Sequence, residues 1–285
     1  MKKLLSLFLS LLIFSYPAYA VSTGSVYDTD TVLMMHCDGD DEASVFTDES
    51  TSNHTVVSAG LGSAVTDSVG PKFGTGACRV WNQVTSSRIE SDDSADWDLG
   101  TGSFTLDFWF MTTNSTKSVQ RILEHGDDST NQWLLQYSTT SGGIIQFISR
   151  TGSSIKITRS AVFVPLNDTW YHIAMTRNVN SVRFFINGLR KGAVGTETVT
   201  VDDNSGHLLV GVQDGGTSGL LYGWLDEIRI VKGLAVWSTA NFTPATSAYT
   251  LYAAPTNSQY RHRGKKSVFQ DQNLRHLGGI DEPLY

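Results

Sequence analysis

The sequence predicts an all-β fold, a sandwich of two antiparallel sheets. Residues 104–110, FTLDFWF, place large apolar side chains at even positions and Thr, Asp and Trp at odd positions, which is the period of a strand with one face in a core. Segments of this kind recur about every ten residues with Gly, Ser, Asn and Asp between them. No stretch keeps a helical period over three turns. With 285 residues, 40% of them hydrophobic, the chain can bury the core of one large domain.

The strands follow in chain order from their apolar residues and from the turns between them. The first ends at an acidic turn that begins at Asp38, and a long loop-rich passage separates it from a strand near Ala77. Two strands joined by a short polar turn precede the Asn187-Gly188 reversal. Residues 233–242 allow one short helical turn at the periphery. The other expected strands are 31–37, 87–89, 104–110, 121–125, 133–137, 144–149, 154–158, 208–212 and 224–231.

The two ends of the chain differ from this pattern. Residues 1–20 carry two lysines, an apolar run and the sequence Ala18-Tyr19-Ala20, the pattern of a signal peptide cleaved after Ala20. We therefore expect a secreted protein, periplasmic or extracellular, whose domain occupies residues 21–252. Residues 253–285 contain the basic cluster RHRGKK and lack a regular apolar period. They are either a flexible extension or a basic arm that docks on a partner or on the acidic domain.

Charge and hydropathy exclude two classes of protein. The net charge is −7, and it falls to −9 without Lys2 and Lys3. Nucleic acid is therefore not an expected partner, because phosphate binding needs a basic face. The apolar run near the start is shorter than the roughly 20 residues of a membrane-spanning helix, and no later stretch qualifies. We expect a soluble protein without a membrane span.

The chain has two cysteines, Cys37 and Cys78, each in a short predicted strand. In a secreted chain they are expected to form a disulfide, since exported proteins meet an oxidising compartment. The alternative is two buried thiols that act as small hydrophobic side chains.

The order of several short motifs resembles the laminin-G-like, concanavalin A-like jelly-roll family. The likeness runs from about Thr31 to Tyr249, and it implies that the sandwich is a jelly roll. Similar proteins bind glycans or other proteins at surfaces. The motifs are MHCDG (35–39), FTDES (46–50), KFG (72–74), DWDLGTGSFTLDFWF (96–110), WYHIA (170–174), the NG reversal and GWLDEIRI (223–230). Cys37 replaces the aromatic residue that is usual in the first motif.

The resemblance also raises calcium, because related jelly rolls often hold a structural or ligand-bridging ion. Asp38, Asp48 and Asp226 lie at family markers. Calcium would need six to eight oxygens from such carboxylates, backbone carbonyls and water. The alternative is that Asp38 and Asp48 cap tight turns through their own backbone and that Asp226 holds a strand by hydrogen bonds.

Sugar binding needs aromatic faces beside polar groups that read hydroxyls. Most of the seven tryptophans are expected in the core, among them Trp170 and Trp224. Trp109 is the candidate, because it falls on the face opposite Phe108 and Phe110, on the same side as Asp107, although that face can also be covered in a sandwich. Loop residues that could add polar contacts to a ligand are Asn131, Gln132, Asp214 and Ser218.

Catalysis has little support in the sequence. Glucanases of this architecture project paired carboxylates from one face of a strand, whereas the acidic pairs Asp226-Glu227 and Asp40-Asp41 are adjacent and point to opposite faces. No nucleophile-elbow, zinc-protease or phosphate-loop motif occurs, and His172 is expected to be structural. The interpretation is a secreted, non-catalytic module that recognises carbohydrate or a glycosylated surface. The alternatives are an adhesion protein of a cell envelope or phage particle that binds protein, and a glycan hydrolase or lyase.

Overall fold

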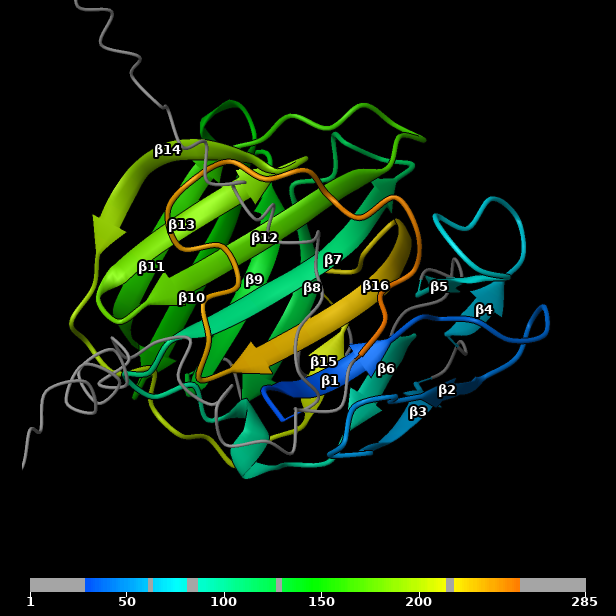
Figure 1. Ribbon diagram of the computed structural model, residues 1–285, viewed down its shortest axis with the longest axis horizontal. Helices are drawn as coiled ribbons and strands as arrows, with labels where there is room; N and C mark the ends of the chain where they lie inside the picture. Colours follow the sequence, from blue (N-terminus) through cyan, green and yellow to red (C-terminus); the bar gives the residue numbers. More distant parts are fainter. Residues whose placement is uncertain (1–28, 61–63, 81–86, 127–129, 214–217, 252–285) are drawn as a thin grey trace, which may run out of the picture.

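The computed structural model describes residues 29–60, 64–80, 87–126, 130–213 and 218–251, which form two antiparallel β-sheets packed face to face (Figure 1). The predicted signal peptide and C-terminal tail lie outside these residues. Two short 3-10 helices, Ala95–Trp97 and Thr140–Gly142, are the only helices in the described part of the chain. The all-β prediction is confirmed, and the arrangement is that of a jelly-roll sandwich.

The first sheet has eight strands. They are β1 (Thr31–Met35), β4 (Val65–Asp67), β5 (Ala77–Arg79), β7 (Phe104–Thr112), β12 (Tyr171–Asn178), β13 (Ser181–Ile186), β14 (Leu189–Thr196) and β16 (Gly223–Lys232). Their order across the sheet is β14-β13-β12-β7-β16-β5-β4, and β1 also pairs with β16. The long central strands β12, β7 and β16 therefore lie side by side, although they are far apart in sequence.

The second sheet also has eight strands. They are β2 (Val45–Thr47), β3 (Thr55–Ala59), β6 (Arg88–Ser91), β8 (Val119–Gly126), β9 (Gln132–Ser138), β10 (Ile144–Thr151), β11 (Ser154–Val162) and β15 (Leu208–Val210). Their order is β11-β10-β9-β8-β15-β6-β3-β2. The strands β2, β3 and β4 lie in the passage that the sequence marked as loop, because three to five residues are too few to show a strand period.

The core lies between the two sheets and follows the alternation of the strands. In β7 the even residues Phe104, Leu106, Phe108 and Phe110 are buried in it, and in β9 the odd residues from Trp133 to Tyr137 face them from the second sheet. The other residues of these strands point to the outer faces of the sandwich.

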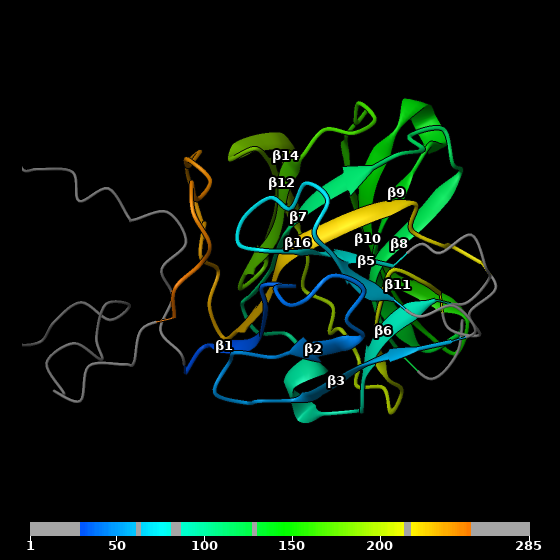
Figure 2. The ribbon, with the colours of Figure 1, turned by 90° about the vertical axis from the view of Figure 1, so that its right-hand side faces the viewer.

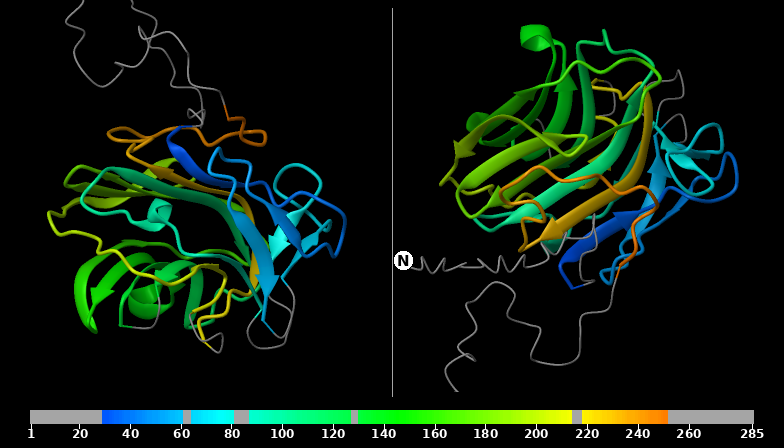
Figure 3. Two further views of the ribbon diagram at one scale, coloured as in Figure 1. Left: turned by 90° about the horizontal axis from the view of Figure 1, so that it is seen from below. Right: turned by 45° about the horizontal axis from the view of Figure 1, so that its top comes forward.

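The outer face of the first sheet is covered by the segment after β16, residues 233–251, which we call the closing strap. It crosses β7, β12 and β16 (Figure 1) and lies on the side of the first sheet that faces away from the second (Figures 2 and 3). Residues 233–242 form bends and no helical turn. Hydroxyls of the sheet hold the strap instead: Thr105 Oγ1 donates to the Leu234 carbonyl at 3.1 Å, and Thr176 Oγ1 donates to the Trp237 carbonyl at 3.0 Å. Two carbonyl groups of the strap are thereby bonded to β7 and β12 beneath them.

Candidate functional site

A pocket of about 420 Å³ opens on the outer face of the first sheet, beside the closing strap. We call it the aromatic pocket. Five parts of the chain build it: the loop before β5, strand β7, the residue that precedes β12, the turn between β13 and β14, and the strap. Its lining residues are Lys72, Phe73, Trp109, Trp170, Asn187, Thr243, Pro244, Ala245 and Thr246.

Trp109 forms the inner wall of this pocket. Register places it opposite His172 on β12 and beside Asp226 on β16, on the outer face that the alternation of β7 predicts. The indole is only 6% exposed. The ring of Phe73 meets it edge-on at 5.6 Å between centroids. Its buried Nε1–H has no hydrogen-bond partner within the described ranges.

Trp170 forms the outer wall, and the expectation that it lies in the core is wrong. Its indole is half-buried and its Nε1 donates to the Gly70 carbonyl at 3.2 Å. It precedes Tyr171, which packs against the core, so alternation turns Trp170 to the outer face together with His172. The same alternation of side chains that predicts an outward position for Trp109 also predicts one for Trp170. Trp224 is also half-buried, with its Nε1 on Asp67 at 3.1 Å, and does not line the pocket.

Lys72 brings a cation to the pocket. Its Nζ lies 4.1 Å from the centroid of the Trp109 ring and 5.2 Å from that of Phe73, within the range of a cation–π contact. Burial lowers the pKa of Lys72, while the carboxylate of Asp226 raises it. The ammonium is therefore placed against aromatic faces at the pocket wall, where it can also meet an acceptor on a ligand.

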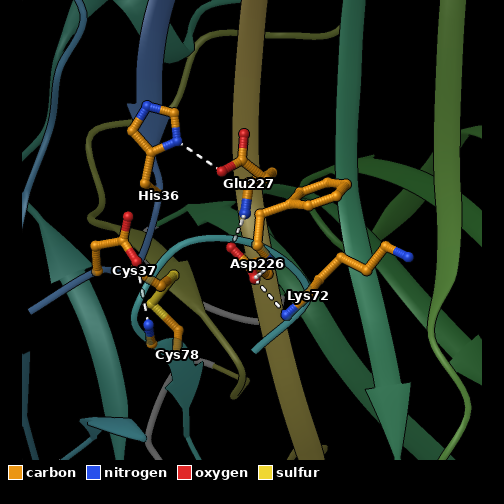
Figure 4. The surroundings of a disulfide bond; sticks show 9 residues. His36, Cys37, Lys72, Cys78, Asp226 and Glu227 are labelled. Atoms are coloured by element: carbon orange, nitrogen blue, oxygen red, sulfur yellow. Dashed lines mark hydrogen bonds and ion pairs between the residues drawn. A yellow bond between two sulfur atoms is a disulfide. The ribbon is translucent and has the colours of Figure 1, made fainter. Parts of the chain in front are cut away.

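Asp226 and Asp38 hold the loop that carries Lys72 and Phe73. The Lys72 and Phe73 amides donate to Asp226 Oδ2 at 2.8 and 3.1 Å (Figure 4). On the other side of the loop, Asp38 Oδ1 accepts from the amides of Thr75 and Gly76. Burial raises the pKa of Asp226 to about 8, against these backbone donors, which lower it.

Gly74 lies at the tip of this loop. It has φ +61°, and a Cβ there would lie 2.2 Å from Asp38 Oδ1, so no larger residue fits between the loop and its aspartate.

Asp107 is engaged in a buried network beneath the strap. Its carboxylate receives Arg229 Nε at 2.9 Å on Oδ1 and Arg229 Nη2 at 3.1 Å on Oδ2. The hydroxyl of Tyr249, from the strap, donates to Oδ2 at 2.7 Å and lies 2.9 Å from His172 Nε2. All four side chains are buried. Asp107 thus ties the strap to the sheet, and it is not exposed to a ligand as the sequence had suggested. His172, which the sequence analysis expects to be structural, is fully buried in this network.

The three aspartates predicted as calcium ligands are not brought together. Asp48 accepts from the amides of Met34, Ser50 and His54 through its two oxygens, each at 2.9 Å, and Asp38 and Asp226 hold the loop described above. Over the described ranges no three His, Cys, Asp or Glu side chains are grouped for a metal ion. Because backbone donors already occupy these carboxylates, the three residues do not fit one shared calcium ion. Equilibrium dialysis of the protein against millimolar calcium tests binding elsewhere.

The remaining predicted contact residues lie away from the aromatic pocket. Asn131 accepts from the Gly152 amide through Oδ1 at 2.9 Å, which fixes the turn between β10 and β11. Gln132 is buried at the start of β9. Ser218 is exposed and lines a second groove, on the second sheet. Asp214 lies outside the described residues. None of these four predictions is tested by the geometry of the pocket.

The predicted disulfide is confirmed. Cys37 and Cys78 are bonded, with 5.1 Å between their Cα atoms, and they join the end of β1 to β5 (Figure 4). Beside the disulfide, Glu227 Oε1 is hydrogen-bonded to His36 Nδ1 at 2.6 Å. The other oxygen of Glu227, Oε2, accepts a hydrogen bond from the Tyr249 amide at 2.6 Å. Burial lowers the pKa of His36, but the hydrogen bond and charge of Glu227 outweigh it and raise this pKa. No helix within the described ranges has the length and apolar character to cross a bilayer.

Solved structures of low sequence identity share this fold. The binding domain of botulinum neurotoxin DC, in complex with rat synaptotagmin II, has a TM-score of 0.55 at 12% identity, over 74% of this chain and 50% of that chain. The binding domain of paraclostridial mosquitocidal protein 1 has a TM-score of 0.52 at 18% identity, over 73% of this chain and 50% of that chain. This chain spans about half the length of both toxin chains.

A third similar structure is close to this chain in length. Domain 4 of AbnA, a GH43 extracellular arabinanase from Geobacillus stearothermophilus, in complex with arabinotriose, has a TM-score of 0.51 at 16% identity, over 75% of this chain and 95% of that chain. At such identities these likenesses show a shared fold.

Sequence comparison identifies the family. No curated protein matches the chain in sequence. The profile of the laminin G family described as the concanavalin A-like lectin/glucanases superfamily matches residues 83–253, more than half of the chain, and the resemblance read from the motifs extends further toward the N-terminus. The chain belongs to the concanavalin A-like lectin/glucanase superfamily.

Proposed function

We propose that this protein is a secreted, non-catalytic module that binds carbohydrate in the aromatic pocket. The observation that carries the proposal is that two indoles, those of Trp109 and of the half-buried Trp170, line one cavity together with the cation of Lys72. An indole face can stack on a pyranose ring, and the Lys72 ammonium can donate a hydrogen bond to one of its oxygens.

The other lining groups suit the same ligand. Thr243 and Thr246 are exposed on the strap and bring hydroxyls that both donate and accept. Asn187 Oδ1 accepts from the His172 amide at 2.8 Å, which leaves its NH₂ group as a donor. Lys72 adds a further donor. At about 420 Å³ the pocket lies within the range of small-ligand sites.

Two further observations support a binding role and an exported protein. No acidic residue is among those lining the aromatic pocket, whereas a glycosidase needs two carboxyl groups flanking the scissile bond. The Cys37–Cys78 bond is of the kind that persists in oxidising compartments, which supports the export that residues 1–20 predict. Among proteins of this fold, the arabinanase domain in complex with arabinotriose is one that holds a saccharide.

A glycan array probed with the purified protein tests the proposal. We expect hits that share a common sugar and that free sugar competes. Trp170→Ala should weaken binding of that sugar by about ten-fold or more, since loss of an aromatic contact of about 1.5 kcal/mol corresponds to such a factor.

Trp224→Ala is the matched control, because Trp224 is also half-buried with one Nε1 hydrogen bond but does not line the pocket. Circular dichroism verifies that both variants are folded. Equal binding by the two variants, or an array without hits, would contradict the proposal.

The same assays identify the two other function classes. An adhesion protein of a cell envelope or phage particle would bind a protein ligand that free glycan does not compete. A hydrolase or lyase would release reducing ends from a bound glycan. The botulinum neurotoxin domain in complex with synaptotagmin shows that a protein of this fold can bind a protein.

A further inference from the structure

The described part of the chain ends close to the aromatic pocket. Leu251, the last described residue, packs on a small apolar cluster that contains Met34, Ala245 and Tyr249. Ala245 is also one of the residues that line the pocket. Leu251 is six residues beyond Ala245, a separation of at most about 20 Å. The tail, residues 253–285, therefore follows from a point within reach of the pocket.

The tail is long enough to return to the pocket, and its net charge is opposite to that of the domain. Residues 253–285 hold five basic and three acidic side chains, a net charge of +2, whereas residues 21–252 hold 14 basic and 25 acidic ones, a net charge of −11. Opposite charges attract, so the tail is drawn toward the domain. The 28 residues between Leu251 and Ile280 can span several times the distance from Leu251 to the pocket.

The pocket combines aromatic walls with one cation. Its aromatic side chains are Phe73, Trp109 and Trp170, and Lys72 is the only charged side chain among the described residues that line it. Lys72 Nζ lies 4.1 Å from the centroid of the Trp109 ring. The nearby carboxylate of Asp226 is bonded to the amides of the loop and does not line the pocket. The pocket therefore matches a ligand that joins an aromatic side chain to a carboxylate.

One stretch of the tail has this composition. Residues 280–285 read IDEPLY, in which an adjacent Asp and Glu lie between apolar residues and a Tyr follows. The basic cluster RHRGKK, residues 261–266, carries charge of the same sign as Lys72, and the two would repel each other. Within the tail, charge and aromatic character together therefore favour residues 280–285 as the part that fits the pocket.

We propose that residues 280–285 of the tail bind in the aromatic pocket of the same chain. In this contact Tyr285 stacks on the indole of Trp170, and one of the two carboxylates pairs with Lys72. Because the tail is tethered, its effective concentration at the pocket reaches up to about millimolar, so that a few contacts suffice. Its consequence rests on the proposed function: a saccharide has to displace the tail, which acts as an internal competitor.

Cross-linking of the full chain with a carbodiimide tests the contact without any saccharide. The reagent activates a carboxylate, the Lys72 amine attacks the activated carbon, and an amide forms while the carboxylate oxygen leaves in the urea by-product. Burial lowers the pKa of Lys72, which favours the neutral amine that reacts. We expect mass spectrometry of a digest to find Lys72 joined to Asp281 or Glu282, with a yield that is independent of protein concentration.

Lys117 is the matched control for Lys72. It is also half-buried, and its Nζ lies 5.0 Å from the centroid of the Tyr222 ring, but it does not line the pocket. We expect no product between Lys117 and the two carboxylates. The double variant Asp281→Asn with Glu282→Gln should abolish the Lys72 product.

Four results would overturn the proposal. The first is that Lys72 forms no product with residues 280–285, and the second is that Lys117 reacts with them as readily. The third is a product between Lys72 and Asp271 instead. The fourth comes from a mixture of ¹⁵N-labelled and unlabelled protein: products that join the two labels would show that the contact lies between copies. Trp170→Ala should lower the yield several-fold, because Tyr285 loses its stacking partner.

The saccharide assays separate this inference from the proposed function. The double variant should bind the sugar found on the array about ten-fold more tightly, as expected for a pocket that is open in roughly one chain in ten. Equal affinity would overturn the competition. A Lys72 cross-link in a protein whose double variant binds no sugar would support the tail contact and refute the proposed function. Sugar binding that depends on Trp170, without the cross-link, would do the reverse.

Discussion

Asp107→Asn tests whether the buried ion pair joins the closing strap to the first sheet. Arg229 is 0% exposed and donates to both oxygens of Asp107 at 2.9 and 3.1 Å, and the Tyr249 hydroxyl donates to one of them at 2.7 Å. Burial opposes the charge of Asp107, but Arg229 and then His172 outweigh it and lower its pKa. Asparagine at position 107 has no charge, and its NH₂ group replaces one of the two carboxylate oxygens. That NH₂ group, itself a donor, then faces the N–H or O–H donors of Arg229 and Tyr249. The buried guanidinium then loses the negative charge of Asp107.

The expected cost is large because a buried charge loses its counter-charge. Breaking such a pair destabilises a protein by about 3–5 kcal/mol, which in a domain of this size lowers Tm by roughly 6–20 °C. Urea unfolding followed by tryptophan fluorescence measures it, and Trp237, whose ring lies 5.6 Å from the Arg229 guanidinium carbon, is a local probe. The control is Asp40→Asn, an exposed position, with a change within about 0.5 kcal/mol.

A loss below about 1 kcal/mol for Asp107→Asn would refute this account of the strap. The double variant Asp107→Leu with Arg229→Met sharpens the test, because it removes both charges together. Apolar replacement of a whole buried pair is often neutral, so the double variant should be more stable than Asp107→Asn alone. If it is less stable, the network contributes more than the removal of one charge explains.

Three further changes have expected outcomes. Replacing Cys37 and Cys78 by serine should cost about 4 kcal/mol, since the bond closes a loop with a sequence separation of 41; urea unfolding with and without reductant measures it. Burial lowers the pKa of His172 below 6.5 more than its carboxylate partner raises it. The unfolded chain therefore binds this proton first, so stability is full above pH 6.5 and is lost as pH falls through the native pKa; His172→Asn should abolish that part of the slope. Gly219→Ala should lower Tm more than Gly142→Ala, because both have positive φ but only the former meets a side chain.

The strand pattern of the sequence predicts which side chains enter the core between the sheets, but it does not predict what covers the outer face of the first sheet. The alternation of β7 predicts which residues enter the core and that Asp107 and Trp109 face outward together. It cannot predict what covers them, because the strap reaches the sheet only through tertiary contacts. Asp107 and Trp109 therefore face outward as expected, and yet one is locked to Arg229 and the other is 6% exposed.

The same limit explains why Lys72 and Thr246 escaped notice as candidate residues. Each lies in a segment without a period, and each joins the aromatic pocket only because another part of the chain holds it there. Trp170 is different, since its parity relative to Tyr171 was legible in the sequence. The family motif that contains Trp170 led to the prediction that it lies in the core. The alternation of the strand predicts its outward position correctly.

Two aspartates that lie in family motifs hold the segments that build the aromatic pocket. Asp226 bonds the amides of Lys72 and Phe73, and Asp107 bonds the hydroxyl of Tyr249. The first carboxylate fixes the loop on one side of the aromatic pocket, and the second fixes the strap on the other side. Neither lines the pocket. Because the frame of the pocket is held by these buried side chains, the groups that line the pocket are free to differ in chemistry without loss of the fold. We therefore expect the specificity of the proposed carbohydrate site to lie in Trp170 and the strap hydroxyls.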